Sequence, residues 1–156
     1  IAIYLMFQNI KLGEMPSPIL FMEDYGLYDE NPCVTYVRKL TMEKFGKDIT
    51  FMELFKATNK RLMITGTNVD KGKAIIFSHH SFPDMKVCDA LDISSRIPML
   101  FTPIIYEGDR YCDGGVMLST PLNIINDGYT PILCISVNSI VSKATSFFDY
   151  SFSIVD

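Results

Sequence analysis

The sequence predicts an α/β sandwich with a mixed, largely parallel sheet. A hairpin signal comes first: an apolar run at 62–69, a polar turn at 70–73 and a second apolar run at 74–77. Next to it, Thr50 and Glu53 have the spacing of a capping box, which opens a helix. Residues 131–137 are apolar almost without interruption, as expected for a strand covered on both faces. Strands that alternate with helices and hairpins in this way pack as layers.

The remaining elements follow from apolar spacing and from breaker residues. A helix over 34–45 has Gly46 as its stop, and the capping-box helix runs to about 59. After the hairpin, we expect a helix that opens at 83–84 and ends near 94–95, and then an extended segment at 100–105. A turn at 106–109 leads into a return strand at 110–112. A short helix at 122–126 and a loop at 128–131 follow. Upstream, 1–10 is either helix or strand, 13–18 is a loop, and 19–22 is an apolar segment that ends in turns at 25–26 and 29–32.

Composition limits the classes of protein and of site. The chain has 156 residues, 48% of them apolar, enough for one globular domain with a core. A net charge of −4 without a basic stripe argues against a nucleic-acid partner. The four cysteines are far apart and form no CxxC or Cys/His ligand pattern, so we expect buried thiols, no disulfide framework and no zinc site. No other metal or cofactor is indicated.

The two ends of the chain predict that 1–156 is part of a larger domain. The sequence begins with Ile1 inside an apolar run and stops at Asp156 in the middle of another pattern, so we expect truncation at both ends. The run at 1–7 has no basic segment and no cleavage site, so it does not read as a signal peptide, and it is too short to span a bilayer.

The candidate catalytic residue is Asp113, which Gly114 and Gly115 follow directly. A carboxylate at a strand end, beside backbone without Cβ atoms, allows other groups to come close. The alternative is an ordinary turn, because Asp-Gly is a common turn dipeptide.

Acyl-transfer chemistry is only partly represented in this sequence. No glycine is followed two positions later by serine, so the chain contains no nucleophile elbow and the nucleophile is unknown. The only histidines, His79 and His80, precede Asp113, and we expect them to be exposed loop residues. A catalytic Asp113 therefore acts as a base without histidine, which a partly desolvated carboxylate can do.

From about 26 to 121 the sequence resembles a patatin-like phospholipase. No single block carries the resemblance; their order and spacing do. The blocks are TFMELF (50–55), NKRLMITGTN (59–68), PDMKVCDAL (83–91), SSRIP (94–98) with Phe101 and Pro103, and YCDGG (111–115) with Pro121.

The resemblance implies a three-layer α/β/α fold and a Ser–Asp dyad that hydrolyses lipid acyl esters. It implies that Asp113 is the dyad acid, that Gly114 and Gly115 shape the site, and that the serine lies in a Gly-x-Ser-x-Gly elbow N-terminal to this chain. The implied partner is a phospholipid or other acyl-ester lipid at a membrane surface, reached from inside the cell and without a transmembrane segment. This chain alone is then expected to be inactive.

Two departures keep other interpretations open. Leu118 and Ser119 stand where the family often has Asn, and Arg96 stands before Ile-Pro where a small residue is usual. One alternative is a non-catalytic relative that binds lipid or protein. Another is an unrelated α/β domain whose Asp-Gly-Gly is only a turn.

Several other side chains were weighed for roles at a site. Ser94 and Ser95 suit hydroxyl caps at a helix end better than nucleophiles. Arg96 is expected to be a solvated surface residue, with a lipid-headgroup contact as the alternative. The 9 Met and 11 Phe residues are expected in the core, with a lipid-facing surface as the alternative. Asn68, after the strand, is a candidate for orienting loops.

Overall fold

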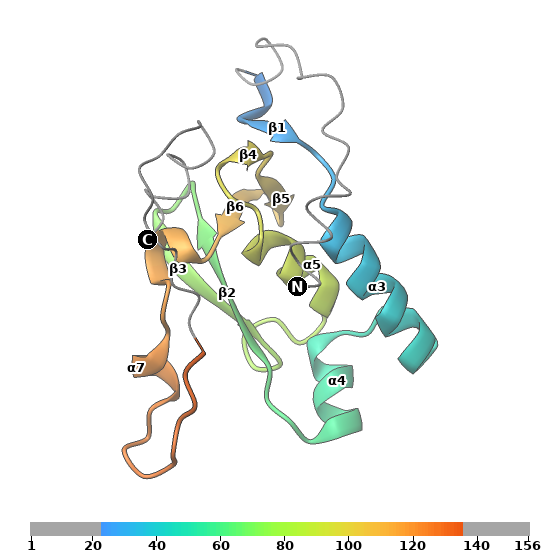
Figure 1. The fold of residues 1–156 in the computed structure, drawn as a ribbon, viewed down its shortest axis with the longest axis vertical. Helices are drawn as coiled ribbons and strands as arrows, with labels where there is room; N and C mark the ends of the chain where they lie inside the picture. Colours follow the sequence, from blue (N-terminus) through green and yellow to red (C-terminus); the bar gives the residue numbers. More distant parts are fainter. Residues whose placement is uncertain (1–22, 136–156) are drawn as a thin grey trace.

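The computed structural model describes residues 23–135 of the chain (Figure 1). The elements are, in chain order, β1 (Gly26–Tyr28), α3 (Pro32–Phe45), α4 (Phe51–Thr58), β2 (Met63–Asn68), β3 (Lys73–Ser78), α5 (Val87–Ser94), β4 (Met99–Phe101), β5 (Ile104–Tyr106), β6 (Asp109–Asp113), α6 (Gly115–Leu118) and α7 (Leu122–Ile125). Most of the elements predicted between 34 and 126 are confirmed. The segments predicted at 1–10, 13–18 and 19–22 lie outside the described residues.

The strands form a four-stranded sheet in the order β3-β2-β6-β5 and a separate pair, β1-β4. The four-stranded sheet is antiparallel throughout, whereas β1 and β4 pair in parallel. A mixed α/β fold is therefore confirmed, but within residues 23–135 the expectation of a largely parallel sheet is wrong. The reason is the connections: β2–β3 and β5–β6 are joined by tight turns, and a parallel pair needs a long crossover.

The helices α3, α4 and α5 gather on one side of β2 and β3 (Figure 1). The core lies between these helices and the sheet, and its most deeply buried members are Phe51, Phe77, Ala90 and Ile93. Tyr111 of β6 joins this core through its ring contact with Phe77. The described residues thus contain one helical layer against the sheet, and the three-layer arrangement stays a proposal.

Local chemistry explains where the first helices begin and end. Thr50 and Glu53 form the predicted capping box: the Thr50 hydroxyl accepts from the Glu53 N–H at 3.2 Å and the Glu53 carboxylate accepts from the Thr50 N–H at 3.0 Å. Asn31 caps α3 by accepting from the Cys33 N–H, and Gly46 ends that helix in the left-handed conformation at φ 71°.

Two element boundaries differ from the prediction. Helix α5 begins at Val87 rather than at 83–84, because the Pro83 and Met85 carbonyls accept from the first backbone N–H groups of α4. The predicted turn at 25–26 is confirmed only at Tyr25, a bend with φ 61°, because Gly26 already starts β1. A Cβ on Gly26 would lie 2.3 Å from the Phe101 carbonyl carbon, so the absence of a side chain allows β1 to pair with β4.

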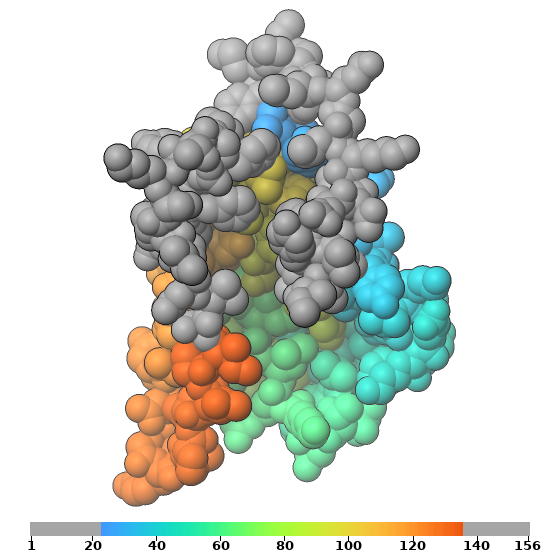
Figure 2. All heavy atoms as spheres, viewed as in Figure 1, coloured from blue at the N-terminus to red at the C-terminus, as the bar shows by residue number. Residues whose placement is uncertain are grey.

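The strand predicted at 131–137 is also wrong as far as the structure describes it. Residues 131–135 form no strand, and Leu133 and Ile135 are each 86% exposed. The segment is part of the orange-to-red region at the lower left of Figure 2. An apolar run becomes a buried strand only beside partner strands, and none of the described strands pairs with it. Residues 136 and 137 lie outside the described range.

Candidate active site

Asp113 is the last residue of β6, and its backbone is held on both sides. Its N–H donates to the Arg96 carbonyl at 2.9 Å, and its own carbonyl accepts from the Thr67 hydroxyl at 2.8 Å. In the ladder Asp113 is opposite Gly66 of β2. These bonds bring the end of α5, the middle of β2 and the end of β6 together at one residue.

The Asp113 carboxylate is half-buried and only partly satisfied. Its Oδ1 atom accepts from the Gly115 N–H at 2.6 Å, and no donor among residues 23–135 bonds Oδ2. Burial raises the pKa of Asp113, and the Gly115 N–H opposes that shift. The group therefore combines a free acceptor oxygen with a basicity above that of an exposed aspartate, which suits a general base.

Gly114 lies against β2 at a distance that excludes a side chain. A Cβ at this position would be 2.3 Å from the Thr65 hydroxyl and 2.6 Å from the Thr65 carbonyl. Gly115 then starts α6, so the chain passes from a strand directly into a short helix. A hydrogen bond from Gly115 to Asp113 is also typical of an ordinary turn aspartate. What distinguishes Asp113 is its burial and its place at the end of a sheet strand.

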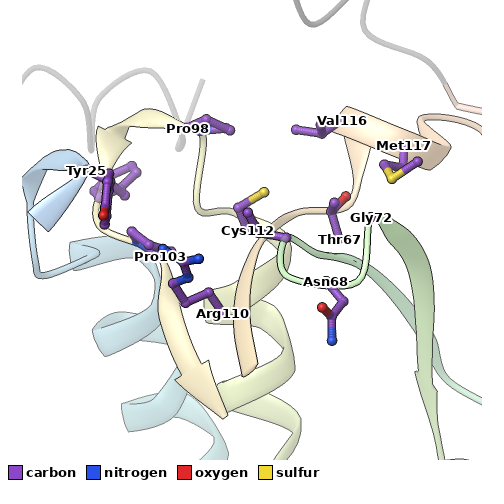
Figure 3. Close-up of a pocket in the computed structure, with 12 residues that line it drawn as sticks. Tyr25, Thr67, Asn68, Gly72, Pro98, Pro103, Arg110, Cys112, Val116 and Met117 are labelled. Atoms are coloured by element: carbon purple, nitrogen blue, oxygen red, sulfur yellow. The ribbon is translucent and has the colours of Figure 1, made fainter. Parts of the chain in front are cut away.

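A cavity lies beside the aspartate on the other face of the sheet. Because side chains alternate along a strand, Asp113 shares the face of Tyr111, whereas Arg110 and Cys112 share the opposite one. The cavity is about 510 Å³, and its lining includes Thr67, Cys112, Val116 and Met117 (Figure 3). The cavity is lined by Cys112, directly before Asp113, and by Val116 and Met117 of α6, but Asp113 itself does not line it.

The comparisons with known proteins agree with the sequence blocks described above. The patatin-like phospholipase family matches residues 6–125. This chain belongs to that family.

Two viral relatives match parts of this chain. A "probable lipid hydrolase 463L" of Invertebrate iridescent virus 6 is 37% identical over 86 residues, 55% of this chain and 30% of the relative. An "uncharacterized protein R571" of Acanthamoeba polyphaga mimivirus is 29% identical over 106 residues, 67% of this chain and 34% of the relative. The chain thus spans about a third of the length of the curated relatives it matches.

Of the two histidines of this patatin-like chain, only His80 is the exposed loop residue that was expected. His80 is exposed, but His79 is only 5% exposed and stacks on Phe55 with ring centroids 4.1 Å apart. Burial, then His80 and Arg61, lower the pKa of His79. His79 follows β3 level with the start of β2, whereas Asp113 pairs farther along β2, at Gly66. The apolar ring of Phe55, which the sequence does not place there, explains the burial.

The serines and Arg96 lie at the end of α5. Ser94 is the last helical residue, and the Ser95 hydroxyl donates to the Leu91 carbonyl at 2.8 Å, as expected for a helix-end hydroxyl. The expectation that Arg96 is solvated is wrong, because the residue is only 6% exposed. Its guanidinium pairs with Asp92, which compensates the cost of burying a cation.

Two polar residues near the site carried little or no weight in the sequence. Thr67 is 4% exposed and its hydroxyl donates to the Asp113 carbonyl, and no pattern in the sequence indicated this contact. Asn68 is 1% exposed; its amide donates to Asp109 at 2.9 Å and its oxygen accepts from the Lys71 N–H at 2.8 Å. Asn68 therefore orients the β2–β3 turn against the β5–β6 hairpin.

The expectation of buried thiols is confirmed for Cys88 and Cys112, which are buried and free. It is wrong for Cys33, which is half-buried, and for Cys134, which is exposed. Burial raises the pKa of Cys112 to about 11, so this thiol next to Asp113 is protonated and weakly nucleophilic at neutral pH. Between residues 23 and 135 no three His, Cys, Asp or Glu side chains gather as a metal site would require.

Among residues 23–135, no helix is both long enough and apolar enough to cross a bilayer.

Proposed function

We propose that this chain carries the acid of a Ser–Asp dyad in a lipid acyl hydrolase, and that Asp113 is its general base. The observation that carries the proposal is the half-buried Asp113 carboxylate with one free acceptor oxygen at the end of β6. Membership of the patatin-like phospholipase family supports it, as does a relative named a probable lipid hydrolase.

The proposed reaction uses the free Oδ2 atom of Asp113. A serine hydroxyl donates its proton to Oδ2 while its oxygen attacks the ester carbonyl of the lipid. When the tetrahedral intermediate collapses, Asp113 returns the proton to the leaving alcohol and an acyl-serine remains. Asp113 then deprotonates a water molecule that cleaves the acyl-serine, and the serine recovers its proton.

The serine and the oxyanion donors come, in this proposal, from polypeptide outside this sequence. No Gly-x-Ser occurs in the 156 residues, so the chain itself offers no elbow. Residues 1–156 are then part of a larger three-layer domain. Gly114 and Gly115 contribute backbone that lets this second part approach Asp113, because Gly114 already packs directly on Thr65.

The proposed partner is a phospholipid or another acyl-ester lipid at a membrane surface, inside the cell. The second candidate is a non-catalytic patatin-like protein that binds lipid or protein. The departures from the family pattern at Arg96, Leu118 and Ser119 favour this candidate, and the coding sequence upstream of Ile1 discriminates between the two.

The test is Asp113→Asn in the full-length protein, assayed on a short-chain ester and on phospholipid vesicles. Asparagine keeps the acceptor for Gly115 but cannot take a proton, so we expect kcat to fall by about 10²–10⁴-fold. Asp84→Asn, at an exposed aspartate, is the matched control and should retain activity. Undiminished activity of Asp113→Asn would rule out the proposed role.

A further inference from the structure

We propose that Arg96 is a positioning residue for Asp113. Its buried guanidinium fixes the turn after α5, and the carbonyl of that same residue accepts the Asp113 N–H at 2.9 Å. The inference rests on the proposed function, since it assigns Arg96 a task in the site of the dyad acid. Arg96 acts through its peptide group, and it touches neither substrate nor the reacting oxygen.

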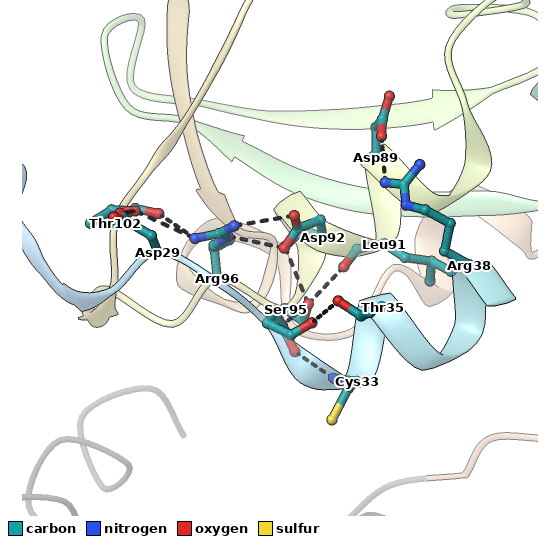
Figure 4. Close-up of polar contacts among 11 residues, drawn as sticks. Asp29, Cys33, Thr35, Arg38, Asp89, Leu91, Asp92, Ser95, Arg96 and Thr102 are labelled. Atoms are coloured by element: carbon teal, nitrogen blue, oxygen red, sulfur yellow. Dashed lines mark hydrogen bonds and ion pairs between the residues drawn. The ribbon is translucent and has the colours of Figure 1, made fainter. Parts of the chain in front are cut away.

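The guanidinium is held at both of its ends (Figure 4). On one side Nε and Nη2 donate to the two oxygens of Asp92 at 3.0 and 3.1 Å, a bidentate pair one helical turn apart. On the other side Nη1 donates to the Thr102 carbonyl at 3.3 Å and to its hydroxyl at 3.4 Å. Only a planar fork of fixed donors makes both sets of bonds, so lysine is a poor replacement.

Thr102 connects this clamp to the parallel strand pair. The Thr102 hydroxyl donates to Asp29 at 2.8 Å, and its N–H donates to the Tyr28 carbonyl at 3.0 Å. Arg96 therefore bridges the end of α5 to the segment that follows β4 and, through it, to the end of β1.

A second connection holds the neighbouring residue. The Ser95 hydroxyl accepts from the Asn31 amide at 2.9 Å, and Asn31 is the residue that caps α3. The turn at 95–97 is thus fixed by the ends of two helices and by the segment after β4. The Arg96 carbonyl in this turn is therefore held in place, and it accepts the N–H of Asp113, the last residue of β6.

The expected loss of kcat follows from what happens to Asp92 and the 95–97 turn when the Arg96 guanidinium is removed. Removing one partner of a buried ion pair leaves the other charge uncompensated, and the turn relaxes toward water. A misplacement of about 1 Å in a catalytic group can cost about 10²-fold in rate. Arg96 therefore affects kcat through the place of Asp113, with substrate binding largely preserved.

The experiment compares Arg96→Met with Arg38→Met in the full-length protein. Arg38 is the matched control because it also binds α5, through Asp89 at 2.8 Å, and the segment before α4, through Asp48, but it makes no bond to the 95–97 turn. The readouts are amide hydrogen exchange at Asp113, kcat and KM. For Arg96→Met we expect faster exchange at Asp113, kcat lower by about 10²-fold and a nearly unchanged KM. For Arg38→Met we expect lower stability without these local changes.

Two further variants keep the test decisive if Arg96→Met folds poorly. Arg96→Lys retains the charge but not the fork, and should give a smaller shift in the same direction. The double variant Arg96→Met/Asp92→Leu leaves no buried charge unpaired, so it should fold and still show fast exchange at Asp113.

Three outcomes would overturn the inference: unchanged exchange at Asp113, equal exchange in the Arg96 and Arg38 variants after correction for global stability, or fast exchange with unchanged kcat. Failure of the proposed function is seen separately, as full activity of Asp113→Asn. In that case the exchange data alone decide whether Arg96 positions Asp113.

Discussion

At the scale of single residues, Asp113 is a carboxylate in a place where burial disfavours its ionised form. Its backbone is bonded to Arg96 and Thr67, and one carboxylate oxygen is bonded to Gly115. The side chain is nevertheless removed from water, and this burial raises the pKa of the carboxyl group. If Asp113 had only a structural role, a neutral side chain at this position would make the fold more stable.

We therefore expect Asp113→Asn to stabilise the fold at neutral pH. Because the folded-state pKa is raised, the stabilisation that protonated Asp113 provides is complete below the ordinary carboxyl pKa. It is lost as pH rises through the raised value. Urea unfolding at a series of pH values from acidic to neutral should show the free energy of unfolding of Asp113→Asn rising relative to that of the native protein. Equal stabilities at neutral pH would contradict this prediction, and Asp84→Asn provides the exposed control.

Gly114 makes the second prediction at this scale. In Gly114→Ala the new Cβ would stand 2.3 Å from the Thr65 hydroxyl and 2.6 Å from the Thr65 carbonyl, so backbone has to shift. We expect a loss of about 1–3 kcal/mol in the free energy of unfolding, together with loss of activity. Gly72→Ala is the comparison, since its Cβ meets nothing within 4 Å and only its φ of +59° is unfavourable. If Gly114→Ala loses no more free energy of unfolding than Gly72→Ala, Gly114 does not pack against Thr65 as closely as described.

At the scale of elements, α4 depends on its first turn more than on its length. The helix has 8 residues, too few to be stable alone, and only Phe51 is fully buried. Its capping box satisfies backbone donors that would otherwise be unpaired, and residues 83–86 accept two more N–H groups. The start of α4 and the chain leading into α5 are therefore one hydrogen-bonded unit.

Removing the cap should destabilise this unit measurably. We expect Thr50→Ala to lower the free energy of unfolding by about 1 kcal/mol, because the Glu53 N–H loses its acceptor. Thr50→Ser keeps the hydroxyl and should restore most of that loss. Chemical denaturation of the three proteins gives the comparison, and an alanine variant as stable as the native protein would show that the box contributes nothing.

At the scale of the whole molecule, the chain contains the proposed base, Asp113, but no Gly-x-Ser elbow. It matches the family over residues 6–125 but only about a third of the length of its viral relatives. The described sheet has its helical layer on one side, and the apolar cavity opens beside Thr67 and Cys112 on the other. These observations are consistent with a domain completed by further polypeptide.

We expect residues 1–156 alone to hydrolyse no ester. The sequence contains no Gly-x-Ser, and the Cys112 thiol beside Asp113 has a pKa of about 11, which keeps it protonated. The measurement is release of a chromogenic alcohol from a short-chain ester, with the full-length protein as positive control. Activity that persists through purification and disappears in Asp113→Asn would place a nucleophile within this chain.

Prediction from sequence succeeded where the signal was local. The capping box at Thr50, the stop at Gly46 and the two hairpins each depend on residues a few positions apart. It failed where the outcome depended on distant partners. His79 is buried because Phe55 stacks on it, and Arg96 is buried because Asp92 and Thr102 meet its guanidinium.

The sequence alone determined the family, the α/β class and the choice of Asp113 as the candidate base, because ordered blocks of residues and short-range spacing carry that information. Only the tertiary structure decided that the described four-stranded sheet is antiparallel, that residues 131–135 form no strand, and that Arg96 and Thr67 hold the backbone of Asp113. Strand pairing and burial are set by contacts between segments far apart in the chain. The spacing of residues within one segment does not show which other segment of the chain will pack against it.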